Sequence, residues 1–157
     1  MNTNEEKSIQ RDRMRFTKNT LSSGLALLAI LFNVLYFVSI YKSDVGSYYY
    51  NILIGASILY NLVFMLAVFL SSEGVKNYKA GYSILLFALG AIQVARIFIL
   101  PMNAHGAVVN NLPVMGDGQF IRVVIYLAAS AACLFFGAAV NLKKSRALAK
   151  YTASLQA

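Results

Sequence analysis

Residues 81–101, GYSILLFALGAIQVARIFILP, decide the fold of this chain. The run is long enough to cross the hydrocarbon core of a bilayer as one helix, which needs about 20 mostly apolar residues. It also contains Arg96, and a charge inside a membrane costs at least about 3 kcal/mol unless it faces a bundle interior, a wet cavity or a counter-charge. We therefore predict a membrane-spanning helix with Arg96 on a side that avoids lipid.

The composition of the whole chain supports the same class. Of its 157 residues, 59% are hydrophobic and only 13% are charged, whereas soluble domains are about half apolar and about a quarter charged. Three more apolar runs lie at about 21–41, 50–71 and 120–141. We predict a single all-α membrane domain, an up-down-up-down bundle of four transmembrane helices. Its remaining parts are a tail at 1–20, an outer loop of irregular backbone at 102–119 and a tail at 142–157.

The positions of lysine and arginine predict the orientation. The first tail has five, the link between the second and third runs has two and the last tail has four, against one and none in the other two links. Cytoplasmic segments carry the excess of these residues, so we expect both termini in the cytoplasm. This bias also explains the net charge of +8 without a nucleic-acid partner. With one cysteine and no Asn-x-Ser/Thr acceptor, it suits the cytoplasmic membrane of a bacterium.

Each apolar run has one polar residue near its middle. These are Asn33, Asn61 and Gln93 in the first three runs and Ser130 in the fourth. The favoured interpretation is a layer of hydrogen bonds that fixes the helix register, each worth about 0.6 to 2 kcal/mol. The alternative is a polar site or pathway.

Arg96 and Arg122 are predicted to lie at similar depths in the outer half of the bundle. Two cations do not share a dry site comfortably. One interpretation is that each snorkels toward lipid phosphates or a local aspartate, Asp117 or Asp44. The other is that Arg96, Arg122 and Gln93 form an outward-facing site for an anion or a lipid headgroup.

Small residues define two helix faces that predict close contacts. They are Ala88, Ala91 and Ala95 in the third run, nearly opposite its polar face, and Ala129, Cys133 and Gly137 in the fourth. Small side chains let helix backbones approach each other in a membrane. We expect the first face to contact another chain and the second to bring a neighbouring backbone close.

Tyrosines gather between residues 36 and 50, at Tyr36, Tyr41, Tyr48, Tyr49 and Tyr50. Their apolar rings and polar hydroxyls are typical of the membrane–water interface. The alternative is an aromatic cage for an exogenous ligand, which requires the rings to converge in space.

The apolar runs lack the residues that several chemistries need. The single histidine, His105, lies in the outer loop and the single cysteine, Cys133, lies in mid-run, so we expect no haem, no metal and no other cofactor. None of the runs contains Asp or Glu, which removes the usual carboxylates of proton-coupled transport. An enzyme is therefore the least favoured class.

Two functions remain. The favoured one is a non-catalytic polytopic membrane protein, an accessory or interaction subunit that binds another membrane protein or a second copy of itself. The alternative is a small oligomeric transporter, channel or lipid- or anion-binding protein that uses Gln93, Arg96 and Arg122. Membrane lipids are expected partners in both.

Overall fold

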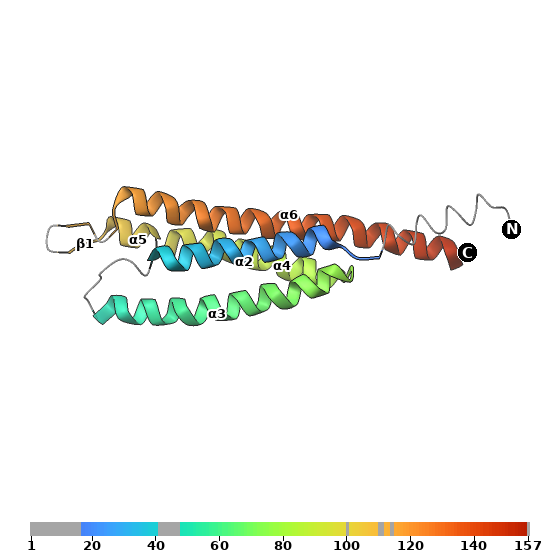
Figure 1. Cartoon of the computed structure of the whole chain (residues 1–157), viewed down its shortest axis with the longest axis horizontal. Coiled ribbons are helices and arrows are strands. Elements are labelled where there is room, and N and C mark those ends of the chain that lie inside the picture. The colour runs from blue at the N-terminus through green and yellow to red at the C-terminus, as the bar shows by residue number, and fades with distance from the viewer. Residues whose placement is uncertain (1–16, 41–47, 100, 110–111, 114, 157) are drawn as a thin grey trace.

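The computed structural model describes residues 17–40, 48–99, 101–109, 112–113 and 115–156. Four long helices lie side by side (Figure 1). They are α2 (Thr20–Ile40), α3 (Tyr48–Lys76), α4 (Ala80–Ile99) and α6 (Asp117–Gln156). All four are long and apolar enough to cross a membrane, which confirms the predicted set of apolar helices and is consistent with a multi-pass membrane protein.

Some of the predictions fall outside this description. Most of the first tail, residues 1–16, and the link at 41–47, with Tyr41 and Asp44, lie outside the described residues. The same is true of the side chains of the three tyrosines at 48–50. Predictions about these residues stay predictions.

Two of the helices, α3 and α6, are longer than the predicted apolar runs. α3 begins at Tyr48 and ends at Lys76 rather than covering 50–71, and α6 continues through the predicted tail to Gln156. Hydrophobicity marks only the part of a helix that contacts lipid. The residues after 141, LKKSRALAKYTA, are mostly good helix formers, so the backbone stays helical beyond the apolar part.

The loop at 102–119, which the sequence predicts on the outer side, is more regular than expected. It contains α5 (Pro101–Gly106) and an antiparallel pair of short strands, β1 (Val108–Val109) and β2 (Leu112–Pro113). Proline suits the first position of a helix, because its missing N–H would have no partner there. The expectation of irregular backbone throughout 102–119 is therefore wrong for these residues.

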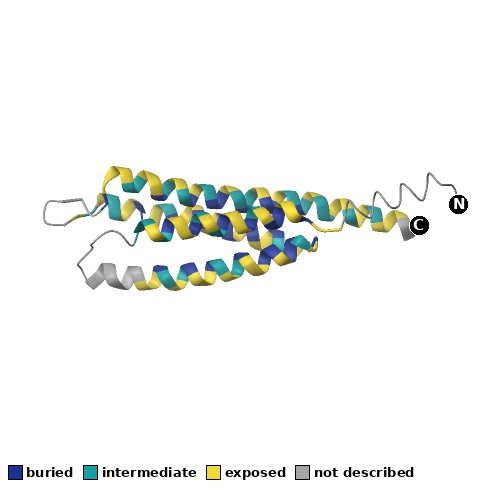
Figure 2. Ribbon diagram, viewed as in Figure 1, coloured by how far each residue is buried: buried dark blue, intermediate teal, exposed yellow. Residues whose placement is uncertain are grey.

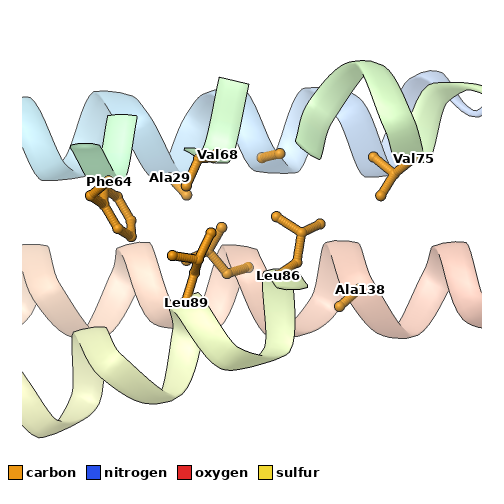
Figure 3. Packing of buried hydrophobic residues seen from close by; sticks show 9 residues of the cluster. Ala29, Phe64, Val68, Val75, Leu86, Leu89 and Ala138 are labelled. Carbon is orange, nitrogen blue, oxygen red and sulfur yellow. The ribbon is translucent and has the colours of Figure 1, made fainter. Parts of the chain in front are cut away.

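An apolar cluster joins the four long helices (Figure 3). α2 and α4 each pack against both α3 and α6. The cluster consists of Ala26 and Ala29 from α2, Phe64, Val68 and Val75 from α3, Leu86 and Leu89 from α4, and Leu134 and Ala138 from α6. α2 contributes only alanines, so its backbone can lie close to that of α6.

Much of the outside of the bundle is formed by exposed residues (Figure 2), and many of them are large and apolar. Ile84 is 70% exposed, Phe136 67% and Leu59 65%. A soluble monomer rarely exposes apolar surface on this scale. A lipid environment accounts for it, because the bilayer interior is itself apolar.

Candidate functional site

A layer of hydrogen-bonded polar side chains crosses the bundle. Gln93 on α4 donates from Nε2 to Asn33 Oδ1 on α2 at 3.1 Å and to Ser130 Oγ on α6 at 3.2 Å. Asn33 Nδ2 donates to Asn61 Oδ1 on α3 at 3.0 Å, and the Ser130 hydroxyl donates to the Ala29 carbonyl at 3.0 Å. The four residues placed at one depth from the sequence therefore lie together, and each is at most 1% exposed.

Arg96 belongs to this layer, with its guanidinium inside the bundle. The residue is 6% exposed. Its Nη1 donates to Asn61 Oδ1 at 2.9 Å and to Asn33 Oδ1 at 3.3 Å, and its Nη2 donates to Ser57 Oγ at 3.0 Å. Gln93 Oε1 accepts a longer bond of 3.5 Å from Nη1. The cation is thus held by neutral oxygens from three helices.

Two tyrosine rings enclose the guanidinium. Arg96 Cζ lies 4.4 Å from the ring centroid of Tyr36 on α2 and 4.4 Å from that of Tyr60 on α3. Cation–π contacts reach about 2 kcal/mol when the cation is desolvated. Tyr36 is fully buried, so its predicted place at the membrane interface is wrong. Its ring packs on the cation instead, and the resulting aromatic cage holds a residue of the chain itself.

The carboxylates of the described residues lie elsewhere. Only Glu73 and Asp117 are acidic among these residues. Glu73 pairs with Lys76 at 3.1 Å, and Asp117 lies 3.8 Å from His105 Nε2. Within the described part of the chain, Arg96 therefore has no carboxylate partner, and neutral dipoles and aromatic faces alone compensate its charge.

Arg122 does not join Arg96. It is exposed, and its Nε donates to the Gly118 carbonyl at 3.1 Å. A separate pocket of about 300 Å³ is lined by Arg122 with Val38, Ser39 and Gln119. The site predicted from Gln93, Arg96 and Arg122 is therefore split, with the first two inside the bundle and the third apart.

A second polar cluster closes the end of the bundle where α2 begins. Asn141 Nδ2 donates to Ser83 Oγ at 2.8 Å and to the Lys79 carbonyl at 3.2 Å. Asn19 Nδ2 donates to Asn141 Oδ1 at 3.0 Å, and Lys144 Nζ donates to Asn19 Oδ1 at 3.2 Å. This cluster was not predicted, although an asparagine at the end of an apolar run is a signal for such a cap.

The two small-residue faces differ in their surroundings. Ala88, Ala91 and Ala95 are exposed on α4. On α6, Ala129 and Cys133 are partly buried and Gly137 is buried. A Cβ atom added at Gly137 would lie 3.3 Å from the Ser22 carbonyl oxygen of α2. The α6 face therefore packs inside the bundle, whereas the α4 face is open in the single chain.

Three residues of the Arg96 site were missed as members of it: Ser57, Tyr36 and Tyr60. The signal was present in the spacing. Ser57 and Tyr60 lie four and one residues before Asn61, and Tyr36 lies three residues after Asn33. Residues three or four apart share a helix face, so the spacing places Ser57 on the same face as Asn61 and Tyr36 on the same face as Asn33.

The chemical groups of the Arg96 site are those of a polar, cationic site. It combines one cation with amide, hydroxyl and aromatic groups, and the hydroxyls of Tyr36 and Tyr60 are buried with no hydrogen-bond partner among the described residues. No family model, curated protein or solved structure matches the chain.

The hydroxyl of Tyr36 has no hydrogen-bond partner among the described residues, which leads to a stability prediction. We expect Tyr36→Phe to raise the free energy of unfolding by about 1 kcal/mol, because it removes this buried polar group and keeps the ring over Arg96. Tyr36→Leu should lower it, since the ring is lost. Thermal unfolding of the purified variants measures both. A loss of stability in Tyr36→Phe would mean that the hydroxyl has a bound partner.

Proposed function

We propose that this protein is a non-catalytic multi-pass membrane protein that acts as an interaction subunit of a larger membrane assembly. The observation that carries the proposal is the buried cation of Arg96, which has no carboxylate partner among the described residues. Ionisable side chains inside membrane bundles usually pair with one another or mark a functional contact. An acidic side chain on a partner's helix at the same depth would supply the missing counter-charge.

The packing of the core favours binding over transport. The apolar cluster (Figure 3) includes Val68 and Leu89, which lie along α3 and α4 between the Arg96 layer and the polar cluster at the other end of the bundle. Water and ions pass such a constriction only when it opens. Within the Arg96 layer the amide groups bond mainly to one another. A binding role therefore ranks ahead of a channel or transporter.

Two surfaces are available to a partner. The Arg96 site comes nearest to the surface at Tyr60, which is only partly buried on α3. The second surface is the alanine face of α4, made of Ala88, Ala91 and Ala95. Small residues allow another helix to approach closely. We assign the acidic group to the first surface and a packing contact with a partner, or with a second copy, to the alanine face.

For the membrane topology we propose an up-down-up-down order with both termini in the cytoplasm of a bacterium. Lys76 and Lys79 follow α3, and four basic residues follow Asn141 on the part of α6 that projects from the bundle (Figure 1). At the opposite end, Arg122 is the one lysine or arginine among the described residues. This bias is the one expected of the cytoplasmic side.

A second candidate function is the binding of an anion or a lipid headgroup at Arg96. The hydroxyls of Tyr36 and Tyr60 support it, because both are possible donors beside a cation and neither has a hydrogen-bond partner among the described residues. In this case the ligand, rather than a partner's side chain, is the counter-charge. Arg122 is not part of this candidate binding site.

The test is extraction of the tagged protein from its own host into nanodiscs, followed by native mass spectrometry. We expect a second membrane protein at fixed stoichiometry with the wild type. Arg96→Gln should lose it because the charge is gone, and Ala91→Phe should weaken it because the bulky ring blocks close approach. Ala128→Phe, at an exposed alanine of α6, is the matched control and should keep the partner.

Two results would overturn the subunit role. One is a monomer or homo-oligomer with no second protein. The other is a co-purifying protein that all three variants retain equally. If the wild type instead carries an anionic lipid or small anion that Arg96→Gln loses, the second candidate function replaces the first.

A further inference from the structure

A groove of about 410 Å³ follows one face of α6 past the end of its apolar part. Phe87 of α4 forms one wall, and Ala139, Lys143, Arg146 and Lys150 are among the α6 residues that line it. The Phe87 ring packs against Phe135 with ring centroids 6.0 Å apart, so this wall is anchored in the bundle. The groove therefore joins an apolar wall to a row of cations.

The helical spacing explains why the cations share one face. Lys143, Arg146 and Lys150 are three, four and seven residues apart, which aligns them over about 10 Å of helix. Lys144 belongs to another face, because its Nζ donates to Asn19 Oδ1 at 3.2 Å. Among the described residues, Glu73 pairs with Lys76 and Asp117 lies near His105. No described acid therefore neutralises the cations of the groove.

The depth of the groove follows from the polar cluster beside it. Asn141 donates to the carbonyl of Lys79, which places this turn of α6 level with the connection between α3 and α4. Phe87 and Ala139 lie on the apolar side of that level, whereas Arg146 and Lys150 lie on the part of α6 that projects beyond it. One face thus changes from apolar to cationic at the end of the apolar helices.

We propose that this groove binds an anionic phospholipid, with the phosphate among Lys143, Arg146 and Lys150 and an acyl chain along Phe87 and Ala139. Basic pockets between membrane helices are suited to anionic headgroups. Lysine and arginine can also cover apolar surface with their stems while their charged ends reach the phosphate. The apolar wall selects a lipid over a soluble phosphate. The proposal is independent of the partner assigned to Arg96.

The test compares phosphatidylglycerol with phosphatidylcholine, which has the same phosphate but no net charge. We expect native mass spectrometry of the full chain to show retained phosphatidylglycerol. The combined change Lys143→Gln, Arg146→Gln and Lys150→Gln should weaken its binding by about tenfold or more. Inorganic phosphate should neither bind at the same concentration nor displace the lipid. Equal retention of the two lipids by the wild type would overturn the proposal.

Two further variants separate the groove from general attraction to positive charge. Lys18→Gln, Lys76→Gln and Lys144→Gln remove the same charge from the same end of the bundle but leave the groove intact, so binding should change by less than about twofold. Ala139→Phe keeps every charge and fills the apolar part, so binding should fall. Equal loss in both triple variants, or full binding in Ala139→Phe, would show that no specific lipid site exists here.

Discussion

Replacing Asn61 by leucine is expected to lower the free energy of unfolding by about 3 kcal/mol. Asn61 Oδ1 accepts the shortest hydrogen bond of the buried guanidinium, 2.9 Å from Arg96 Nη1, and also accepts from Asn33 Nδ2 at 3.0 Å. Leucine has a similar size, so packing changes little. The loss arises because a desolvated cation and an amide each lose an acceptor. Chemical unfolding of wild type and variant in the same detergent measures the difference.

The same variant in a background without the charge is the control. Arg96→Met removes the cation and keeps an unbranched apolar side chain, so its own effect on stability should be small or favourable, as when a buried ion is replaced by apolar groups. In that background Asn61→Leu should cost only about 1 kcal/mol, the value of a neutral hydrogen bond. An equal loss in both backgrounds would show that Asn61 does not stabilise the charge of Arg96.

The sequence predicted the four helices and part of the site because both depend on local patterns. A run of about 20 apolar residues has few alternatives to a membrane helix. Asn33, Asn61, Gln93 and Ser130 could be placed at one depth because rise per residue and alternating direction suffice for depth. Hydropathy could not locate the end of α6 at Gln156, because the projecting part is polar yet rich in helix formers.

The identity of the partners of Arg96 depends on how the helices are rotated about their axes. The three-residue spacing of Gln93 and Arg96 places them on one face. Depth along the helices alone, however, pairs Arg96 with Arg122. In the structure α2 and α3 present Tyr36 and Tyr60 to the guanidinium. The rotation of each helix about its axis depends on packing between helices, which a single sequence does not reveal.

The close approach of α2 and α6 leaves little room for a side chain at Gly137. A Cβ atom there would lie 3.3 Å from the Ser22 carbonyl oxygen and 3.4 Å from Leu25 Cβ. We expect Gly137→Leu to lower the free energy of unfolding by about 3 kcal/mol, because a larger side chain must push the two backbones apart. The measurement is again chemical unfolding in detergent.

Gly24→Leu provides the matched control for this substitution. Gly24 lies on α2, is exposed and has no atom within 4 Å of an added Cβ among the described residues. Leucine there should raise stability by up to about 1 kcal/mol, because glycine is a poor helix former. If the free energy of unfolding falls in Gly137→Leu and rises in Gly24→Leu, the loss arises from the α2–α6 contact. If the Gly137→Leu variant were as stable as the Gly24→Leu variant, α2 and α6 could not lie as close together as the structure shows. The hydrogen bonds from Gln93 to Asn33 on α2 and to Ser130 on α6 depend on that closeness, so they would be contradicted too.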